Sequence, residues 1–179
     1  MINFIYFPTF QISTVMVLFV RKIKYFQRGA TIMKILFYDT KSYDREFFEK
    51  LLPSYPGIEI KFIEANIHEE TAALAHGYDA ICAFVNADLG APVIEELHRQ
   101  GVKLILMRCA GYNNVDLETA ARCEIQVARV PGYSPEAVAE HAMALALTAN
   151  RHTHKAYIKC RENNFALNGL MGVNFYQKT

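Results

Sequence analysis

From Met33 onward, short apolar runs alternate with turn residues and with segments whose apolar positions recur three and four residues apart. The first pattern predicts buried strands and the second predicts helices. The expected strands are Lys34–Tyr38, Ile58–Ile63, Ala80–Phe84, Lys103–Met107 and Ile125–Val130. The expected intervening helices cover Tyr43–Leu52, Glu69–Ala75, Ala91–Arg99 and Leu117–Arg122. This alternation is typical of βαβ units, so we predict an α/β fold with a flavodoxin-like five-stranded parallel sheet and helices on both faces.

A longer helix is expected after the last strand. Ser134 suits an N-cap, Pro135 suits the first helical position and Glu136 places an acid in the first turn. The helix should run from Pro135 to about Arg151 and is apolar around most of its circumference, so other surfaces should cover it on several sides. His141 lies inside this stretch and is interpreted as a core or interface histidine, while the other histidines are expected at the surface.

Residues 1–32 are predicted to be an extension outside the folded body. Their apolar residues, Ile2 to Val20, are interrupted by polar residues and by Pro8, and the basic cluster follows them rather than preceding them. This is unlike a secretory signal, and only Val15 to Val20 is unbroken, which is short for a membrane helix. Membrane attachment is not favoured, although a weak signal anchor stays open as an alternative.

The composition restricts the class of protein. The 179 residues are 52% apolar and 21% charged, with a formal net charge of +1, so one sizeable core is expected and a nucleic-acid partner is not. Four cysteines, Cys82, Cys109, Cys123 and Cys160, are far apart and form no C-x-x-C pair. They suggest neither a metal site nor a disulfide framework, and a reducing cytoplasm is the simplest location.

In open parallel sheets, ligands bind beyond the carboxyl ends of the strands. The loops expected there are Asp39–Ser42, Val85–Gly90, Arg108–Asn114 and Pro131–Ser134. In the third of these, small residues allow backbone N–H groups to face an anion, and Gly111 permits close approach. The competing interpretation is a glycine turn leading into a helix capped by Asn114 or Asp116.

Other polar residues in these loops have two interpretations each. The phenol of Tyr133 is placed to donate to a bound carboxylate, but it also suits loop packing. Asn86 and Asp88 suit turn hydrogen bonds, and Asp88 also suits a helix cap. The chain contains no G-x-G-x-x-G, Walker, G-x-S-x-G or H-E-x-x-H motif, so no phosphate-cradling loop is expected.

Two segments together resemble a known family. Residues 108–117, RCAGYNNVDL, and residues 130–143, VPGYSPEAVAEHAM, resemble the D-isomer-specific 2-hydroxyacid dehydrogenases, in particular the bacterial D-lactate dehydrogenases. The likeness extends from Met33 to Thr179. It implies a substrate-binding domain over residues 33–133, an inter-domain helix over 134–155 and a linker over 156–179 toward an NAD-binding domain.

The resemblance also implies a chemistry. The amides of Ala110 and Gly111 and the hydroxyl of Tyr133 would bind the carboxylate of a small 2-oxo or 2-hydroxy acid. The full-length enzyme would use NAD, transfer hydride to an acid such as pyruvate, and form a homodimer.

The sequence departs from the family by ending at Thr179, before the glycine fingerprint and the family's catalytic arginine, glutamate and histidine. We therefore assign no catalytic residue and expect this chain to bind no NAD and to be inactive alone. A non-catalytic interaction module and a truncated gene product stay open as alternatives.

Overall fold

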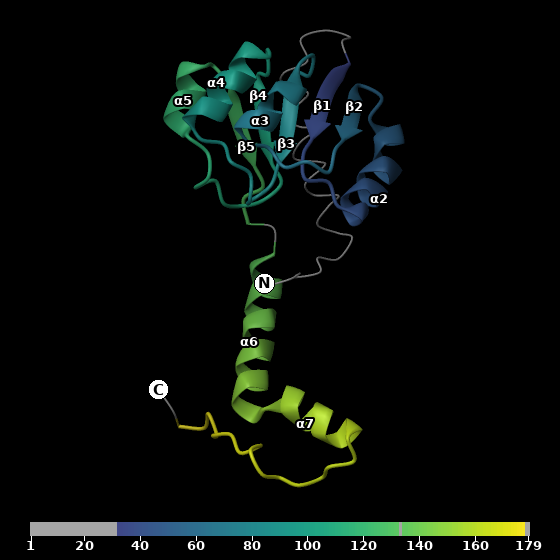
Figure 1. Cartoon of the computed structure of the whole chain (residues 1–179), viewed down its shortest axis with the longest axis vertical. Coiled ribbons are helices and arrows are strands. Elements are labelled where there is room, and N and C mark those ends of the chain that lie inside the picture. Colours follow the sequence, from purple (N-terminus) through teal and green to yellow (C-terminus); the bar gives the residue numbers. More distant parts are fainter. Residues whose placement is uncertain (1–31, 133, 178–179) are drawn as a thin grey trace. The chain divides into compact units, whose positions relative to one another are not determined.

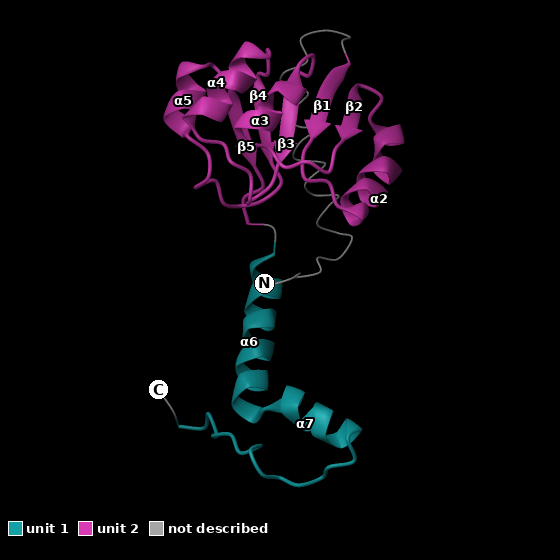
Figure 2. Cartoon of the chain, viewed as in Figure 1, with its two compact units in different colours: residues 1–6, 134–179 teal, residues 7–133 magenta. Residues whose placement is uncertain are grey.

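The computed structural model describes residues 32–132 and 134–177, which belong to two separate units (Figure 2). The first unit along the chain, which is magenta and marked unit 2 in Figure 2, contains the strands and the shorter helices, coloured purple to green in Figure 1. Its strands are β1 (Met33–Phe37), β2 (Ile58–Phe62), β3 (Ala80–Ala83), β4 (Leu104–Met107) and β5 (Gln126–Arg129). Its α-helices are α2 (Ser42–Leu51), α3 (Glu69–Ala72), α4 (Ala91–Arg99) and α5 (Leu117–Arg122). Two short 3-10 helices, η1 (Leu52–Ser54) and η2 (Ala73–Ala75), follow α2 and α3.

The five strands form one parallel sheet in the order β2-β1-β3-β4-β5. Each strand lies within one residue of its predicted position, and the α/β fold is confirmed. The chain leaves β1 toward β2 on one side and then crosses to β3 on the other, so the strand order reverses between β1 and β3. At such a reversal point the loops that follow the two neighbouring strands lead to opposite sides, which leaves a place where a ligand can bind.

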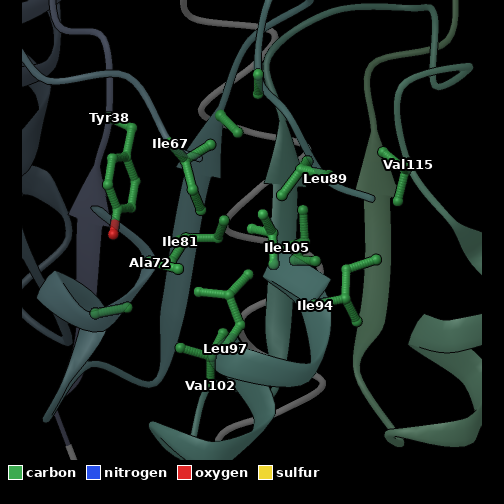
Figure 3. Close-up of a cluster of buried hydrophobic side chains, with 14 of the residues drawn as sticks. Tyr38, Ile67, Ala72, Ile81, Leu89, Ile94, Leu97, Val102, Ile105 and Val115 are labelled. Atoms are coloured by element: carbon green, nitrogen blue, oxygen red, sulfur yellow. The ribbon is translucent and has the colours of Figure 1, made fainter. Parts of the chain in front are cut away.

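One face of the sheet is covered by α3, α4 and α5 (Figure 3). Leu97 and Ile94 of α4 are fully buried against Ile81 of β3 and Ile105 of β4. The spacing of Val93, Ile94 and Leu97 puts these side chains on one side of α4, which explains why that helix lies on the sheet.

The other face carries α2 and an aromatic cluster. Phe48 of α2 meets Phe37 of β1 edge-on with ring centroids 5.0 Å apart, and Phe62 of β2 lies 5.3 Å from Phe37. Edge-to-face and tilted pairs at such distances are favourable beyond the area that they bury. These contacts fix α2, and therefore the loop that leads into it, against the ends of β1 and β2.

The second unit along the chain, which is teal and marked unit 1 in Figure 2, consists of α6 (Pro135–Arg151), α7 (Thr153–Arg161) and the segment up to residue 177. The helix α6 has the predicted bounds, with Pro135 in its first turn, but the Ser134 side chain makes no capping hydrogen bond. His152 adopts φ +51°, which ends α6, so the single helix implied over 134–155 is interrupted at this residue and α7 begins at Thr153. The core interpretation of His141 is wrong because this side chain is exposed, as are most residues of α6. Its alternative role at an interface stays a prediction.

Asn150 connects α6 to the last described segment. Its side chain donates to the Val173 carbonyl at 2.7 Å and accepts from the Val173 N–H at 3.0 Å. Gly172 permits this approach, because a Cβ there would overlap the Asn150 carbonyl oxygen. One amide side chain therefore holds the chain after α7 beside the end of α6.

The predicted extension, residues 1–32, lies outside the described residues apart from Ile32. Among the helices that the structure describes, none has the length and apolar character needed to cross a bilayer.

Candidate anion-binding site at the carboxyl edge of the sheet

The loops that follow β1, β3, β4 and β5 meet at one edge of the sheet, because parallel strands all end there. Backbone hydrogen bonds connect each of these loops to its neighbour along the edge. The Tyr38 N–H donates to Cys82 at 3.0 Å, the Arg108 N–H to Ala83 at 3.0 Å and the Val130 N–H to Cys109 at 3.2 Å. These bonds extend the sheet pairing into the loops and fix where each loop starts.

Arg108 directly follows β4, and its side chain reaches the loop after β1, beside the point where the strand order reverses. Its guanidinium lies between the rings of Phe37 and Phe84, 4.7 and 4.6 Å from their centroids. It donates to the carbonyl oxygens of Tyr38 at 3.2 Å and Asp39 at 2.8 Å. With only 7% of its side chain exposed, Arg108 is a framework residue that ties the loop after β4 to the loop after β1.

Two carboxylates accompany this buried cation. Asp39 and Asp44 approach the Arg108 guanidinium at 3.8 and 3.6 Å. Burial raises the pKa of Asp44, and the attraction of Arg108 offsets part of that rise. Asp44 also accepts from the Lys41 N–H at 3.0 Å, which fixes the start of α2. The charges here are directed at one another, so this cluster supports the loops and does not face a ligand.

The loop after β4 has the features of an anion site. Among the described residues, the backbone N–H groups of Ala110 and Gly111 have no acceptor. A Cβ added at Gly111 would meet no atom of residues 32–132 or 134–177 within 4 Å, so the space beside this residue is open within the described chain. Unpaired N–H groups beside open space are what a carboxylate needs from a protein backbone.

The far end of the loop is anchored by side-chain hydrogen bonds. Asn114 donates to the carbonyl of Ala87 at 2.9 Å, and the Asp116 carboxylate accepts from the Thr119 N–H at 2.9 Å. The helix-capping role offered for Asp116 is therefore confirmed, while Asn114 connects the loop to the one after β3. Asp88 accepts from the Gly90 N–H at 3.1 Å within that loop, which is a turn contact.

Two thiols and a strand-end arginine complete the surroundings. Burial raises the pKa of the Cys82 thiol to about 12 and also raises the pKa of Cys109. Both therefore keep their protons at neutral pH, and Cys109 donates its proton to the Gly111 carbonyl at 3.3 Å. Arg129, at the end of β5, donates to the Ala110 carbonyl at 3.0 Å.

The structure brings Ala110 and Gly111 together in one loop, whereas Tyr133 lies outside the described residues and its role stays a prediction. Sequence reasoning missed Arg108 and Arg129. An arginine that directly follows a buried apolar strand, as Arg108 follows Met107, was the available signal for the first. No signal was present for the second, because its partner lies in another loop.

Comparison with known proteins places this geometry in context. Residues 35–170 match the model of the D-isomer specific 2-hydroxyacid dehydrogenase catalytic domain. The chain belongs to this family. It is 48% identical to a D-lactate dehydrogenase from Escherichia coli strain K12 over 147 residues, which cover 82% of this chain and 44% of the relative.

Solved structures of the family agree with the fold. The apo-structure of D-lactate dehydrogenase from Escherichia coli superposes with a TM-score of 0.71 at 48% identity, covering 79% of this chain and 44% of that one. A structure described as the pyruvate reductase of Chlamydomonas reinhardtii gives a TM-score of 0.71 at 42% identity, covering 81% and 43%. The chain thus spans less than half the length of the family members that it matches.

Proposed function

We propose that this chain forms the substrate-binding part of an NAD-dependent D-2-hydroxyacid dehydrogenase acting on a small acid such as pyruvate or D-lactate. The observation that carries the proposal is the pair of N–H groups of Ala110 and Gly111, which lie beside open space and have no acceptor among the residues that the structure describes. The names of the relatives, D-lactate dehydrogenase and pyruvate reductase, support a short 2-oxo or 2-hydroxy acid as the ligand.

The backbone supplies the recognition in this proposal. Two N–H groups donate to the two oxygens of the substrate carboxylate, and a hydrogen bond to an ionised acceptor is stronger than a neutral one. Tyr133 follows this loop cluster in sequence and is proposed to add a third donor. The Arg108 guanidinium faces the carboxylates of Asp39 and Asp44, and Lys41 pairs with Asp39 at 2.6 Å, so two cations balance two carboxylates and selectivity for an anion rests on the amides.

The cofactor is a separate matter. NAD needs a loop that wraps its pyrophosphate, and the nine glycines of this sequence include no G-x-G-x-x-G. The residues present therefore do not fit a dinucleotide, and we derive no hydride-transfer step from them. We propose that a separate domain of the complete enzyme holds NAD and supplies the acid/base groups.

Binding measurements on the purified chain test this division of labour. Pyruvate is expected to bind in the millimolar range and to shift the amide NMR signals of Ala110 and Gly111, as befits a few hydrogen bonds without a closed site. NADH is expected not to bind, and NADH-dependent pyruvate reduction is expected to be absent. Turnover that persists in protein freed of host dehydrogenase would contradict the proposal, as would amide signals that pyruvate leaves unchanged.

One observation favours a second candidate, a module that pairs with an intact dehydrogenase subunit. No residue of α6 or α7 is buried, and Met143 and Leu145 are each 57% exposed. The chain can be co-expressed with a full-length dehydrogenase of this family and purified by affinity. This experiment distinguishes the interaction module from the first proposal. Recovery of the full-length subunit through the second unit supports the module, and its absence from the purified material removes that candidate.

A further inference from the structure

Three successive peptide groups in the loop after β4 have their carbonyl oxygens hydrogen-bonded. The Cys109 carbonyl accepts from the Val130 N–H at 3.2 Å, the Ala110 carbonyl from the Arg129 guanidinium at 3.0 Å, and the Gly111 carbonyl from the Cys109 thiol at 3.3 Å. The matching N–H groups of these peptides belong to Ala110, Gly111 and Tyr112. None of the three has an acceptor in the part of the chain that the structure describes.

The direction of these N–H groups follows from peptide geometry. The described peptide bonds are all trans, so the carbonyl and the N–H of one planar group point in opposite directions. A donor that holds the Ala110 carbonyl therefore also sets the direction of the Gly111 N–H, which points away from Arg129. Each of the three N–H groups therefore points away from the donor that holds the carbonyl oxygen of the same peptide group.

Arg129 differs from the other two donors. The Val130 N–H is part of the backbone and the Cys109 thiol is a weak donor within the loop, whereas Arg129 is a full charge that reaches the loop from the end of β5. Its guanidinium also lies 5.1 Å from the ring centroid of Tyr112, so it contacts the loop at two points. A charged donor on the Ala110 carbonyl polarises that peptide and makes its N–H a stronger donor.

We propose that Arg129 is a positioning residue that orients and polarises the Gly111 N–H through the Ala110 carbonyl. This assignment rests on the proposed function, since the N–H group serves a substrate carboxylate there. Arg129 acts from behind the peptide and makes no contact with the substrate itself. The Arg129 residue is exposed, so its removal leaves no cavity in the core.

The test compares three variants of the full chain in titrations with pyruvate. Arg129→Met removes the donor and the charge, and Arg129→Lys keeps both with poorer geometry. Arg122→Met is the matched control, because Arg122 is an exposed arginine paired with Glu95 at 2.8 Å and not bonded to the loop. Arg129→Met is expected to weaken pyruvate binding roughly two- to tenfold, the factor that one lost hydrogen bond gives.

Further readouts separate positioning from a merely structural or remote electrostatic role. Arg129→Lys is expected to recover part of the affinity, Arg122→Met to bind as the unsubstituted chain does, and the unfolding midpoints of all four proteins to agree. The Gly111 amide signal of the ligand-free chain is expected to move in Arg129→Met, because its peptide has lost its carbonyl partner. The ratio of affinities should persist in added salt, which screens exposed charges at a distance.

Each outcome is decisive. Pyruvate binding by Arg129→Met equal to that of the unsubstituted chain overturns the assignment, and so does a Gly111 signal that does not move. A loss that salt abolishes, or that Arg122→Met shares, shows a general charge effect and also overturns it. If the unsubstituted chain fails to bind pyruvate, the proposed function falls and the assignment falls with it. Should Arg129→Met fail to fold, Arg129→Gln provides the same comparison with a neutral donor of shorter reach.

Discussion

The two units of this protein bury their apolar residues very differently. In the unit of residues 32–132, buried side chains cover the sheet from Met33 in β1 to Val130 after β5. In the unit of residues 134–177, no residue of α6 or α7 is buried, and α6 exposes Val138, Met143, Leu145 and Leu147 by 45–57%. The first unit has a buried apolar core of its own, although a few of its side chains such as Leu74 and Val85 are exposed, whereas the helices of the second unit bury no residue.

This difference has a consequence for function. Burying a large apolar side chain is worth roughly 1.5–3 kcal/mol, so a helix that is apolar on most sides is stable in water only when something covers it. The sheet unit, in contrast, has what it needs to hold a ligand loop in place. We therefore expect the anion site to be complete within residues 32–132, apart from Tyr133, while the second unit serves contacts with other protein surfaces.

The largest effect should come from the core of the sheet unit. Leu97→Ala removes a fully buried side chain from α4 and is expected to cost about 2–5 kcal/mol of the free energy of unfolding. Leu145→Ala in α6 makes the same chemical change at a side chain that is 57% exposed and should cost within about 0.5 kcal/mol in the monomer. Urea unfolding of both variants makes the comparison, and equal losses would refute the contrast between the units.

A smaller effect is expected when a cation is removed from each unit. Arg108→Met leaves the carbonyls of Tyr38 and Asp39 without this donor and should cost about 1–3 kcal/mol of the free energy of unfolding. Arg161→Met removes an exposed arginine bonded to the Tyr157 hydroxyl at 3.2 Å and should cost within about 0.5 kcal/mol. Thermal unfolding of the two variants measures both losses of stability. If Arg108→Met unfolds at the same temperature as the unsubstituted chain, the guanidinium is not needed to hold the two loops together.

The exposed face of α6 should make the chain self-associate. Leu145→Glu places a charge on that face and is expected to weaken association roughly tenfold, a difference of about 1.4 kcal/mol. Lys155→Glu introduces the same residue at an exposed polar position of α7 and is the matched control. Sedimentation over a range of concentrations measures both. An unsubstituted chain that stays monomeric throughout would show that α6 needs no second copy.

The smallest effect concerns the pH dependence of the sheet unit. Because burial raises the pKa of Asp44 above its usual 3.8, the folded state holds this proton more tightly than the unfolded state. The contribution of Asp44 to stability is therefore fully present below pH 3.8 and is lost as the pH rises through the folded-state pKa. Asp44→Asn should remove this slope, so its stability relative to the unsubstituted chain should improve from acidic to neutral pH.

Urea unfolding at a series of pH values measures that slope. Glu49→Gln, which removes an exposed carboxylate from the same helix, is the control. If the difference in free energy of unfolding between Asp44→Asn and the unsubstituted chain stays constant with pH, the Asp44 carboxyl has the same pKa in the folded and unfolded states.

The sequence predicted the sheet unit far better than the second unit, for a physical reason. Local periodicity marks strands such as Leu104–Met107, because each buried strand is a short apolar run between turn residues. The helix α7 has no such period, and none of its residues is buried within the described chain, so no amphipathic pattern marks it. Where burial does not shape the sequence, the pattern contains little information.

The candidate site divides in the same way. The small residues around Gly111 predict a candidate anion-binding loop from the sequence alone, because glycine and its small neighbours are local features, and that role stays a prediction. Arg108 bonds to a residue 69 positions away, and Arg129 to one 19 positions away. Such contacts depend on the strand order, which local periodicity does not specify. The framework of the site therefore required the structure.

The most direct test of the anion site is a comparison of the unsubstituted chain with Gly111→Ala. A Cβ at position 111 meets no atom of the described residues within 4 Å, so the fold should tolerate Gly111→Ala, which adds a methyl group beside the N–H groups proposed to hold the substrate. We predict that Gly111→Ala unfolds at the same temperature as the unsubstituted chain but no longer binds pyruvate, as followed by the amide signals of Ala110 and Tyr112. Equal binding of pyruvate by the two proteins would contradict the account, because a methyl group beside these amides should crowd a carboxylate that is bound to them.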